Sequence, residues 1–225
     1  MIQRTKLCDR RLPDYTEKEE QLNTVSHIAG AIFGAAALIL CLLQSIHLHS
    51  VWAIVGSTVY GASLIWLYTM SSVYHGLREE HPKKVMQVLD HCTIYALIAG
   101  TYTPILLCAI REVSPAAAWS LFGAVWGCAA LATVFTAIDL KRYAKFSMAC
   151  YIGMGWCIVF AAKAAFASIA PAGLLLLLGG GIAYTLGAVL YAVGKKHRYF
   201  HSIFHLFVLV GSILQFFCVL LYVLR

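Results

Sequence analysis

Long stretches without a charged side chain are the feature that most restricts the fold of this chain. An α-helix that crosses a bilayer core needs about 20 consecutive apolar residues, because lipid offers its backbone no hydrogen-bond partners. The first charge-free stretch is long enough for two such helices and each of the others for one. We therefore predict an all-α membrane protein, a seven-transmembrane helix bundle. The stretches without Asp, Glu, Lys or Arg are residues 21–77, 91–110, 113–138, 146–162, 164–194 and 199–224.

Turn-forming residues divide these stretches into individual spans. A polar hairpin at residues 47–50 separates the first two spans, and Pro171 begins the sixth. Pro104 is expected to kink the third span. The three glycines at 179–181 are expected either to bend the sixth span or to let a neighbouring helix approach closely. The predicted spans are residues 24–46, 51–74, 89–110, 116–138, 146–166, 173–193 and 200–224.

The distribution of Lys and Arg predicts how the bundle is oriented, since these residues are retained on the cytoplasmic side. Fourteen of the 17 fall on the same side of the membrane as the amino terminus. We therefore expect the N-terminus in the cytoplasm and the C-terminus outside, in a multi-pass protein of the cell inner (cytoplasmic) membrane. The fourteen are Arg4, Lys6, Arg10, Arg11, Lys18, Arg78, Lys83, Lys84, Lys141, Arg142, Lys145, Lys195, Lys196 and Arg198; Arg111, Lys163 and Arg225 lie on the other side.

The same pattern limits domains and partners. Residues 1–23 are expected to form a short cytoplasmic N-terminal segment, and residues 24–225 a single seven-helix transmembrane domain. The net charge of +7 is explained by the Lys and Arg residues that set the topology and attract anionic lipid headgroups. The sequence has no basic patch with interleaved aromatic residues, so nucleic-acid binding is not expected. The eight cysteines have no CxxC spacing, so neither a disulfide framework nor a thiolate metal site is expected.

Histidine, aspartate and serine gather at the cytoplasmic ends of three spans. His75 ends the second span, Asp90 begins the third, and His201 and His205 begin the seventh. Positions i and i+4 share one helical face, which suits two imidazoles converging on one metal ion. Three neutral imidazoles and a water form the open pattern of a catalytic Zn²⁺ site. We therefore predict His75, His201 and His205 as zinc ligands.

Two further residues are assigned roles beside the predicted ligands. Asp90 is expected to accept a hydrogen bond from water on the zinc ion and to act as a general base. Ser71, one turn before His75, could orient that water or a substrate carbonyl. His81 and His197 fall in predicted loops, where an interfacial hydrogen-bonding role is the simpler expectation.

Two interpretations remain open for the start of the first span. Asn23 or Thr24 could be the N-cap of the helix, with Glu20 near its positive end. Alternatively, the segment could form a fourth wall of the polar pocket, with Asn23 and His27 touching Asp90 or a substrate. Asp139, at the end of the fourth span, is expected to be a solvated interfacial charge.

Five motifs, in the same order along the chain, carry a resemblance to a known family. They are Glu20-x-x-Asn23-x-x-Ser26-His27, Ser71-x-x-x-His75, the segment from Asp90 to Pro104, Gly153-Met154-Gly155-Trp156 and His201-x-x-x-His205. The combination resembles the bacterial hemolysin III family, within the progestin and adipoQ receptor superfamily (adiponectin receptor-like), with alkaline ceramidases as more distant relatives.

The resemblance implies properties beyond those derived from spacing. In the family, the matching Ser, Asp and three His positions surround a zinc ion near the cytoplasmic leaflet, and relatives act as zinc-dependent lipid amide hydrolases. Bacterial members are also described as hemolysins and as proteins that adjust membrane fluidity or energy state. The chain lacks the long N-terminal domain of the animal receptors, so hormone-receptor activity is not carried over.

Three functions are consistent with these observations. The leading prediction is a membrane-embedded zinc-dependent hydrolase acting on a lipid amide or ester and influencing lipid homeostasis, with membrane lipids as candidate substrate or ligand. The alternative is a non-enzymatic sensor or regulator of membrane state, in which a structural zinc joins the second and seventh helices. A pore-forming hemolysin fits less well, because seven apolar spans disfavour the soluble state that a secreted pore former needs. The sequence identifies no protein partner.

Overall fold

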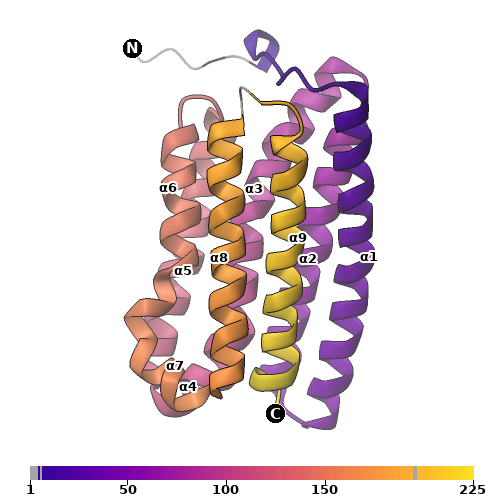
Figure 1. Ribbon diagram of the computed structural model, residues 1–225. Helices are drawn as coiled ribbons and strands as arrows, with labels where there is room; N and C mark the ends of the chain where they lie inside the picture. Colours follow the sequence, from indigo (N-terminus) through magenta and orange to yellow (C-terminus); the bar gives the residue numbers. More distant parts are fainter. Residues whose placement is uncertain (1–4, 6, 195–196) are drawn as a thin grey trace.

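The computed structural model describes residues 5, 7–194 and 197–225 of the chain, and its regular structure there is entirely helical (Figure 1). Within these residues, seven helices are long and apolar enough to cross a membrane. The predicted fold class is therefore confirmed. The orientation of the termini stays a prediction. Four of the Lys and Arg residues on which it rests lie outside the described residues: Arg4, Lys6, Lys195 and Lys196.

Each membrane-length helix corresponds to one predicted span. A short 3₁₀ helix, η1 (Leu7–Asp9), precedes them. The spans are α1 (Glu17–His47), α2 (Val51–Gly76), α3 (Glu80–Ile105) continued by η2 (Leu106–Ile110) and α4 (Arg111–Val113), α5 (Pro115–Ile138), α6 (Ala144–Gly155) continued by η3 (Cys157–Ala161) and α7 (Ala162–Ser168), α8 (Pro171–Val193), and α9 (Phe200–Cys218) continued by η5 (Val219–Val223).

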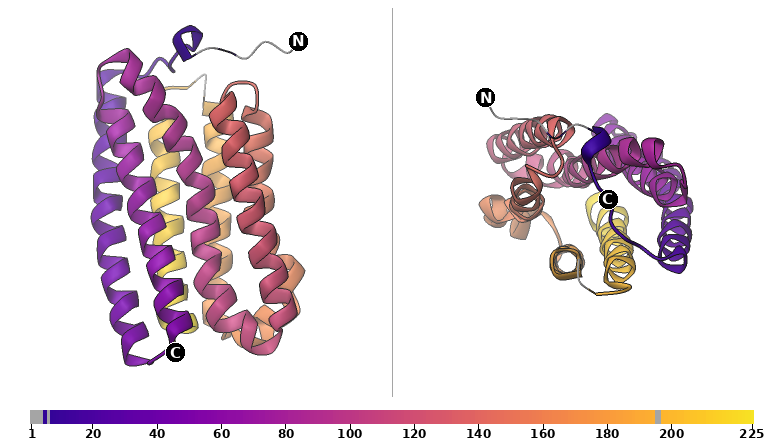
Figure 2. Two further views of the ribbon diagram at one scale, coloured as in Figure 1. Left: turned by 180° about the vertical axis from the view of Figure 1, so that it is seen from behind. Right: turned by 90° about the horizontal axis from the view of Figure 1, so that it is seen from above.

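The helices form one bundle with apolar side chains on its outer surface. α1 packs on α2, α2 on α3 and α3 on α5, while α9 lies between α8 and α1 (Figure 2). The start of α1 and the C-terminus lie at opposite ends of this bundle (Figure 1). Large apolar side chains such as Ile32, Trp66, Phe160 and Leu175 are exposed, as expected for a surface that faces lipid.

The first helix begins earlier than the apolar pattern predicts. Thr16 is its N-cap: the Thr16 hydroxyl accepts a hydrogen bond from the Glu19 amide at 3.3 Å, and the Glu19 carboxylate accepts one from the Thr16 amide at 2.8 Å. This is a capping box, which satisfies two otherwise unpaired amides. The interpretation of Asn23 or Thr24 as the N-cap is therefore wrong, because both lie well inside α1.

Two spans depart from regular α-helix along their length, and α9 ends in the π-helix η5. Pro104 lies inside α3, and from Leu106 the helix continues as a wider π-turn, consistent with the backbone hydrogen bond that proline removes. In the fifth span the α-helix stops at Trp156. There the Tyr102 hydroxyl donates to the Gly155 carbonyl and accepts from the Ile158 amide, both at 2.9 Å. A side chain of α3 therefore satisfies the backbone groups that the break exposes.

The glycine run in the sixth span allows a close helix contact. α8 is one continuous helix, and a Cβ atom added at Gly180 would lie 2.7 Å from Nε2 of Gln215 on α9. Of the two expectations for this run, the structure supports close approach at Gly180.

Asp139 is buried, contrary to the expectation of a solvated charge. Its side chain accepts hydrogen bonds from the backbone amides of Thr5 at 2.8 Å and Arg142 at 3.1 Å. The amino-terminal segment covers the end of α5 and so removes this carboxylate from water. The seven cysteines from Cys41 onward, whose side chains the structure describes, are free.

Candidate metal centre

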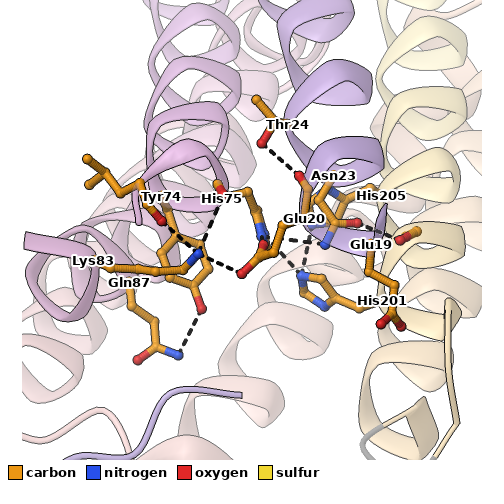
Figure 3. A network of polar contacts seen from close by, with 12 residues as sticks. Glu19, Glu20, Asn23, Thr24, Tyr74, His75, Lys83, Gln87, His201 and His205 are labelled. Carbon is orange, nitrogen blue, oxygen red and sulfur yellow. Dashed lines mark hydrogen bonds and ion pairs between the residues drawn. The ribbon is translucent and has the colours of Figure 1, made fainter. Parts of the chain in front are cut away.

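Three histidines from two helices meet at the end of the bundle nearest the amino-terminal segment. Nε2 of His201 lies 3.3 Å from Nε2 of His75 and 3.0 Å from Nε2 of His205 (Figure 3). His75 and His205 are buried, and the three side chains could hold a metal ion between them. The structure therefore brings together the three residues that the sequence predicted as ligands.

Local helix geometry explains how these side chains converge. His75 lies in the last turn of α2, while His201 and His205 occupy successive turns on one face of α9. Tyr199, immediately before α9, has a left-handed backbone conformation with φ of 64°. Its amide donates to Glu19 of α1 at 2.6 Å, which fixes the point at which α9 begins.

Two charged side chains support His75 on the side away from the other histidines. Oε2 of Glu20 lies 2.5 Å from Nδ1 of His75, and Oε1 of Glu20 lies 2.6 Å from Nζ of Lys83 (Figure 3). A carboxylate on the second ring nitrogen is the usual companion of a metal-binding imidazole, because it fixes the tautomer and the ring orientation. Sequence reasoning placed Glu20 nearby but did not identify it as the partner of His75.

Asn23 and His27 also contact the cluster. Oδ1 of Asn23 accepts a hydrogen bond from Ser202 at 2.6 Å, and Nδ2 of Asn23 lies 3.4 Å from Nδ1 of His75. The His27 ring stacks on His205 with centroids 3.8 Å apart, and among the described residues neither of its nitrogens has a hydrogen-bond partner. This supports the second interpretation of the segment, as a wall of the polar site.

An aromatic residue that the sequence did not single out covers the cluster. The Tyr15 ring stacks on His201 with centroids 4.8 Å apart and lies 5.9 Å from His75. Burial raises the pKa of the Tyr15 hydroxyl above its usual range, so the phenol stays neutral. Tyr15 therefore contributes an apolar cover without adding charge.

Asp90 and Ser71 lie on the wall of a cavity that also reaches the histidines. The cavity has a volume of about 160 Å³, and its wall includes His27, His201 and His205. Oδ2 of Asp90 lies 3.6 Å from Nδ1 of His91. The other two residues that the sequence assigned to the site therefore share one cavity with His201 and His205.

Away from the histidines the cavity becomes apolar and extends along α9. Its wall there includes Ile94, Leu97 and Val208, and it continues to Gln215. Because a helix rises 1.5 Å per residue, Gln215 lies about 15 Å beyond His205 along α9. The arrangement combines a polar, metal-competent end with a largely apolar extension of the same cavity. By contrast, His81 and His197 are exposed and lie away from this cavity wall.

Comparison with known proteins identifies the family. A family model described as haemolysin-III related matches residues 15–216. The chain belongs to the haemolysin III family. This haemolysin III chain is 41% identical over 207 residues to Hemolysin-3 of Bacillus cereus, covering 92% of the chain and 93% of that protein. It is 37% identical over 211 residues to the Hemolysin-3 homolog of Bacillus subtilis (strain 168), covering 94% of the chain and 97% of that protein.

More distant similarity extends to animals. The chain is 26% identical over 209 residues to the human monocyte to macrophage differentiation factor, an adiponectin-receptor-like protein, covering 88% of the chain and 85% of the relative. No solved structure matches the chain. Family membership and the seven apolar helices show a multi-pass membrane protein, which in bacteria resides in the cell membrane.

Proposed function

We propose that this haemolysin III protein is a membrane-embedded zinc-dependent hydrolase that cleaves a lipid amide or ester and thereby influences membrane lipid homeostasis. The observation that carries the proposal is the cavity whose wall contains Asp90 and Ser71 together with His201 and His205, and whose remaining wall is largely apolar. Membrane lipids are the proposed substrates, since a largely apolar wall suits an acyl chain.

Two of the separations between the three imidazoles fit zinc. Four ligands arranged as a tetrahedron at the usual zinc to nitrogen distance of about 2.0 Å place neighbouring nitrogens about 3.3 Å apart. Two of the three Nε2 separations are 3.0 Å and 3.3 Å, and all three ligand atoms lie within 4.8 Å of one another. Three imidazoles leave one tetrahedral position for water or substrate, which is the pattern of catalytic zinc sites.

The side chains on the cavity wall suggest how hydrolysis would proceed. A bound zinc ion would polarise the substrate carbonyl and lower the pKa of water to about 7. Asp90 takes the proton from water as the water oxygen attacks the carbonyl carbon, and Ser71 donates a hydrogen bond to the carbonyl oxygen. Asp90 then returns the proton to the leaving nitrogen or oxygen as its bond to carbon breaks. The products are a fatty acid and an amine or alcohol.

The test is turnover of a panel of long-chain lipid amides and esters by purified protein in lipid nanodiscs. Chelation should abolish turnover and added Zn²⁺ should restore it. His205→Ala should lose both metal and activity, whereas His197→Ala, at an exposed position, should retain both. Turnover that survives chelation or the loss of His205 would exclude the zinc mechanism.

One observation favours a second candidate, a non-enzymatic regulator of membrane state with a structural zinc. The three predicted ligands come from α2 and α9, so a metal ion bound to them would also join these two helices. Tyr15, which precedes α1, stacks on one of the ligands, His201. Asp90→Asn distinguishes the candidates. For a hydrolase, it should keep stoichiometric zinc and lose about 10²-fold to 10⁴-fold in turnover, the usual contribution of a general base. For a structural site, the variant should leave the membrane phenotype unchanged.

A further inference from the structure

The first helix supplies none of the three histidines, but it contacts both helices that do. Three of its residues, Glu19, Glu20 and Asn23, lie in its first two turns and face the cluster (Figure 3). The contacts of these three residues divide between α2 and α9. α1 therefore lies where it can set the distance between His75 and the other two ligands.

Glu20 makes the shorter of two contacts with His75 on α2; Nδ2 of Asn23 lies 3.4 Å from the same ring nitrogen. The Glu20 carboxylate, 2.5 Å from Nδ1 of His75, keeps a proton on that nitrogen and leaves the Nε2 lone pair facing the cluster. The second carboxylate oxygen is held by Lys83, whose ammonium also donates to the Leu77 carbonyl at 2.9 Å. Glu20 is thus restrained by α2 and α3 at once, and it cannot swing away without taking its carboxylate from the Lys83 ammonium in a largely buried position.

Glu19 and Asn23 are the contacts with α9. Glu19 accepts a hydrogen bond from the Tyr199 amide at 2.6 Å and one from Arg198 at 3.3 Å. Asn23 accepts one from Ser202 at 2.6 Å. Ser202 lies directly after His201, so these bonds hold the turn of α9 from which the first ligand projects.

We infer that Glu19, Glu20 and Asn23 form a clamp that presets the metal geometry, with Glu20 as the residue that positions His75. The inference rests on the metal site of the proposed function, but it does not depend on hydrolysis. A preset site binds its ion more tightly, because the ligands do not have to be ordered when the ion arrives. Loss of such a carboxylate partner typically weakens metal binding 10-fold to 100-fold.

The experiment measures Zn²⁺ affinity of the full-length protein after metal removal, by competition with a chromophoric chelator. Glu20→Gln should weaken binding about 10-fold to 100-fold. Glu20→Asp, which keeps the charge on a shorter side chain, should restore part of the affinity. Glu17→Gln is the matched control: its side chain is 75% exposed and pairs with Arg78, which is 88% exposed. Such surface pairs contribute little, and its affinity should equal that of the wild type.

A second readout separates positioning of the ligand from support of the fold. Zinc should raise the thermal midpoint of the wild type and of Glu17→Gln, and it should raise that of Glu20→Gln by much less at the same ion concentration. A purely structural role would instead lower the midpoint of metal-free Glu20→Gln and leave its zinc affinity unchanged.

Each outcome decides a different point. Equal affinity of Glu20→Gln and wild type overturns the clamp and leaves the proposed function standing. A wild type that binds no divalent ion overturns both. If Glu20→Gln does not fold, Ser202→Ala replaces it, because this small change removes only the bond to Asn23. Zinc affinity unchanged in Ser202→Ala then overturns the clamp.

Discussion

Asp139 shows how its surroundings determine what a single carboxylate does. It is 1% exposed, directly after the end of α5. Burial opposes its ionisation, but hydrogen bonds from Thr5 and Arg142 outweigh burial and lower the pKa of Asp139. Because the folded value lies below the ordinary pKa of about 3.9, ionised Asp139 stabilises the folded protein at neutral pH. That contribution disappears as the pH falls through the folded pKa.

Asp139→Asn is therefore expected to destabilise the protein at pH 7 by about 1.5 to 3 kcal/mol, the usual worth of hydrogen bonds to a charged group. Thermal unfolding in detergent measures this. The difference from wild type should shrink as the pH is lowered below about 4. Asp14→Asn is the control, since the Asp14 side chain is 99% exposed. Equal midpoints for Asp139→Asn and wild type at pH 7 would contradict the assignment.

The sequence was enough to identify site residues that are close together on one helix or lie at the end of a predicted span. His201 and His205 are one turn apart, and His75 ends a span, so helix geometry and span order were enough to group them. The partners of Glu20 and Asp139 lie far away in sequence: Glu20 and His75 are 55 positions apart, and Thr5 and Asp139 are 134 apart. Nothing in the sequence alone joins such pairs. A Glu one turn before Asn23, on the same helical face, was the available signal for Glu20.

At the scale of helices, the contact between α1 and α2 depends on glycine. A Cβ atom added at Gly61 would lie 2.5 Å from the Cβ atom and 2.8 Å from the Cα atom of Leu38 on α1. On α1, a Cβ atom at Gly34 would lie 3.1 Å from the backbone nitrogen of Ile65. Small residues of this kind let membrane helices approach closely and gain packing energy.

Gly61→Ala is expected to separate α1 from α2 and cost about 1 to 3 kcal/mol, as overpacking typically does. Gly127→Ala on α5 is the matched control, because a Cβ atom there meets nothing within 4 Å. Thermal unfolding of both variants in the same detergent gives the comparison. If Gly61→Ala is as stable as Gly127→Ala, the two helices do not rely on this contact.

Apolar length predicted how many helices there are, but not where each one starts or breaks. α1 and α3 begin at Glu17 and Glu80, before their apolar stretches. In α1 a capping box satisfies amides of the first turn, so the helix can extend past the hydrocarbon. The break at Trp156 depends on Tyr102 from another helix. Its position could not be predicted from the fifth span itself.

For the whole molecule, orientation decides which compartment supplies metal and water to the site. The histidine cluster lies at the end of the bundle that carries the amino-terminal segment, and the C-terminus lies at the opposite end (Figure 1). The excess of Lys and Arg on the amino-terminal side predicts that this end faces the cytoplasm. The proposed hydrolase would then draw zinc from the cytoplasm and release its polar product there.

Reporter fusions in a bacterial host test this orientation. Alkaline phosphatase is active only outside the cytoplasm, whereas green fluorescent protein exported by the same route stays dark. A phosphatase fused after Arg225 should therefore be active and a fluorescent protein there dark, with the opposite result after Arg142, in the connection between α5 and α6. The opposite pattern at both positions would place the cluster on the outer side. Zinc would then have to arrive from outside the cell, because the cluster lies at that end of the bundle.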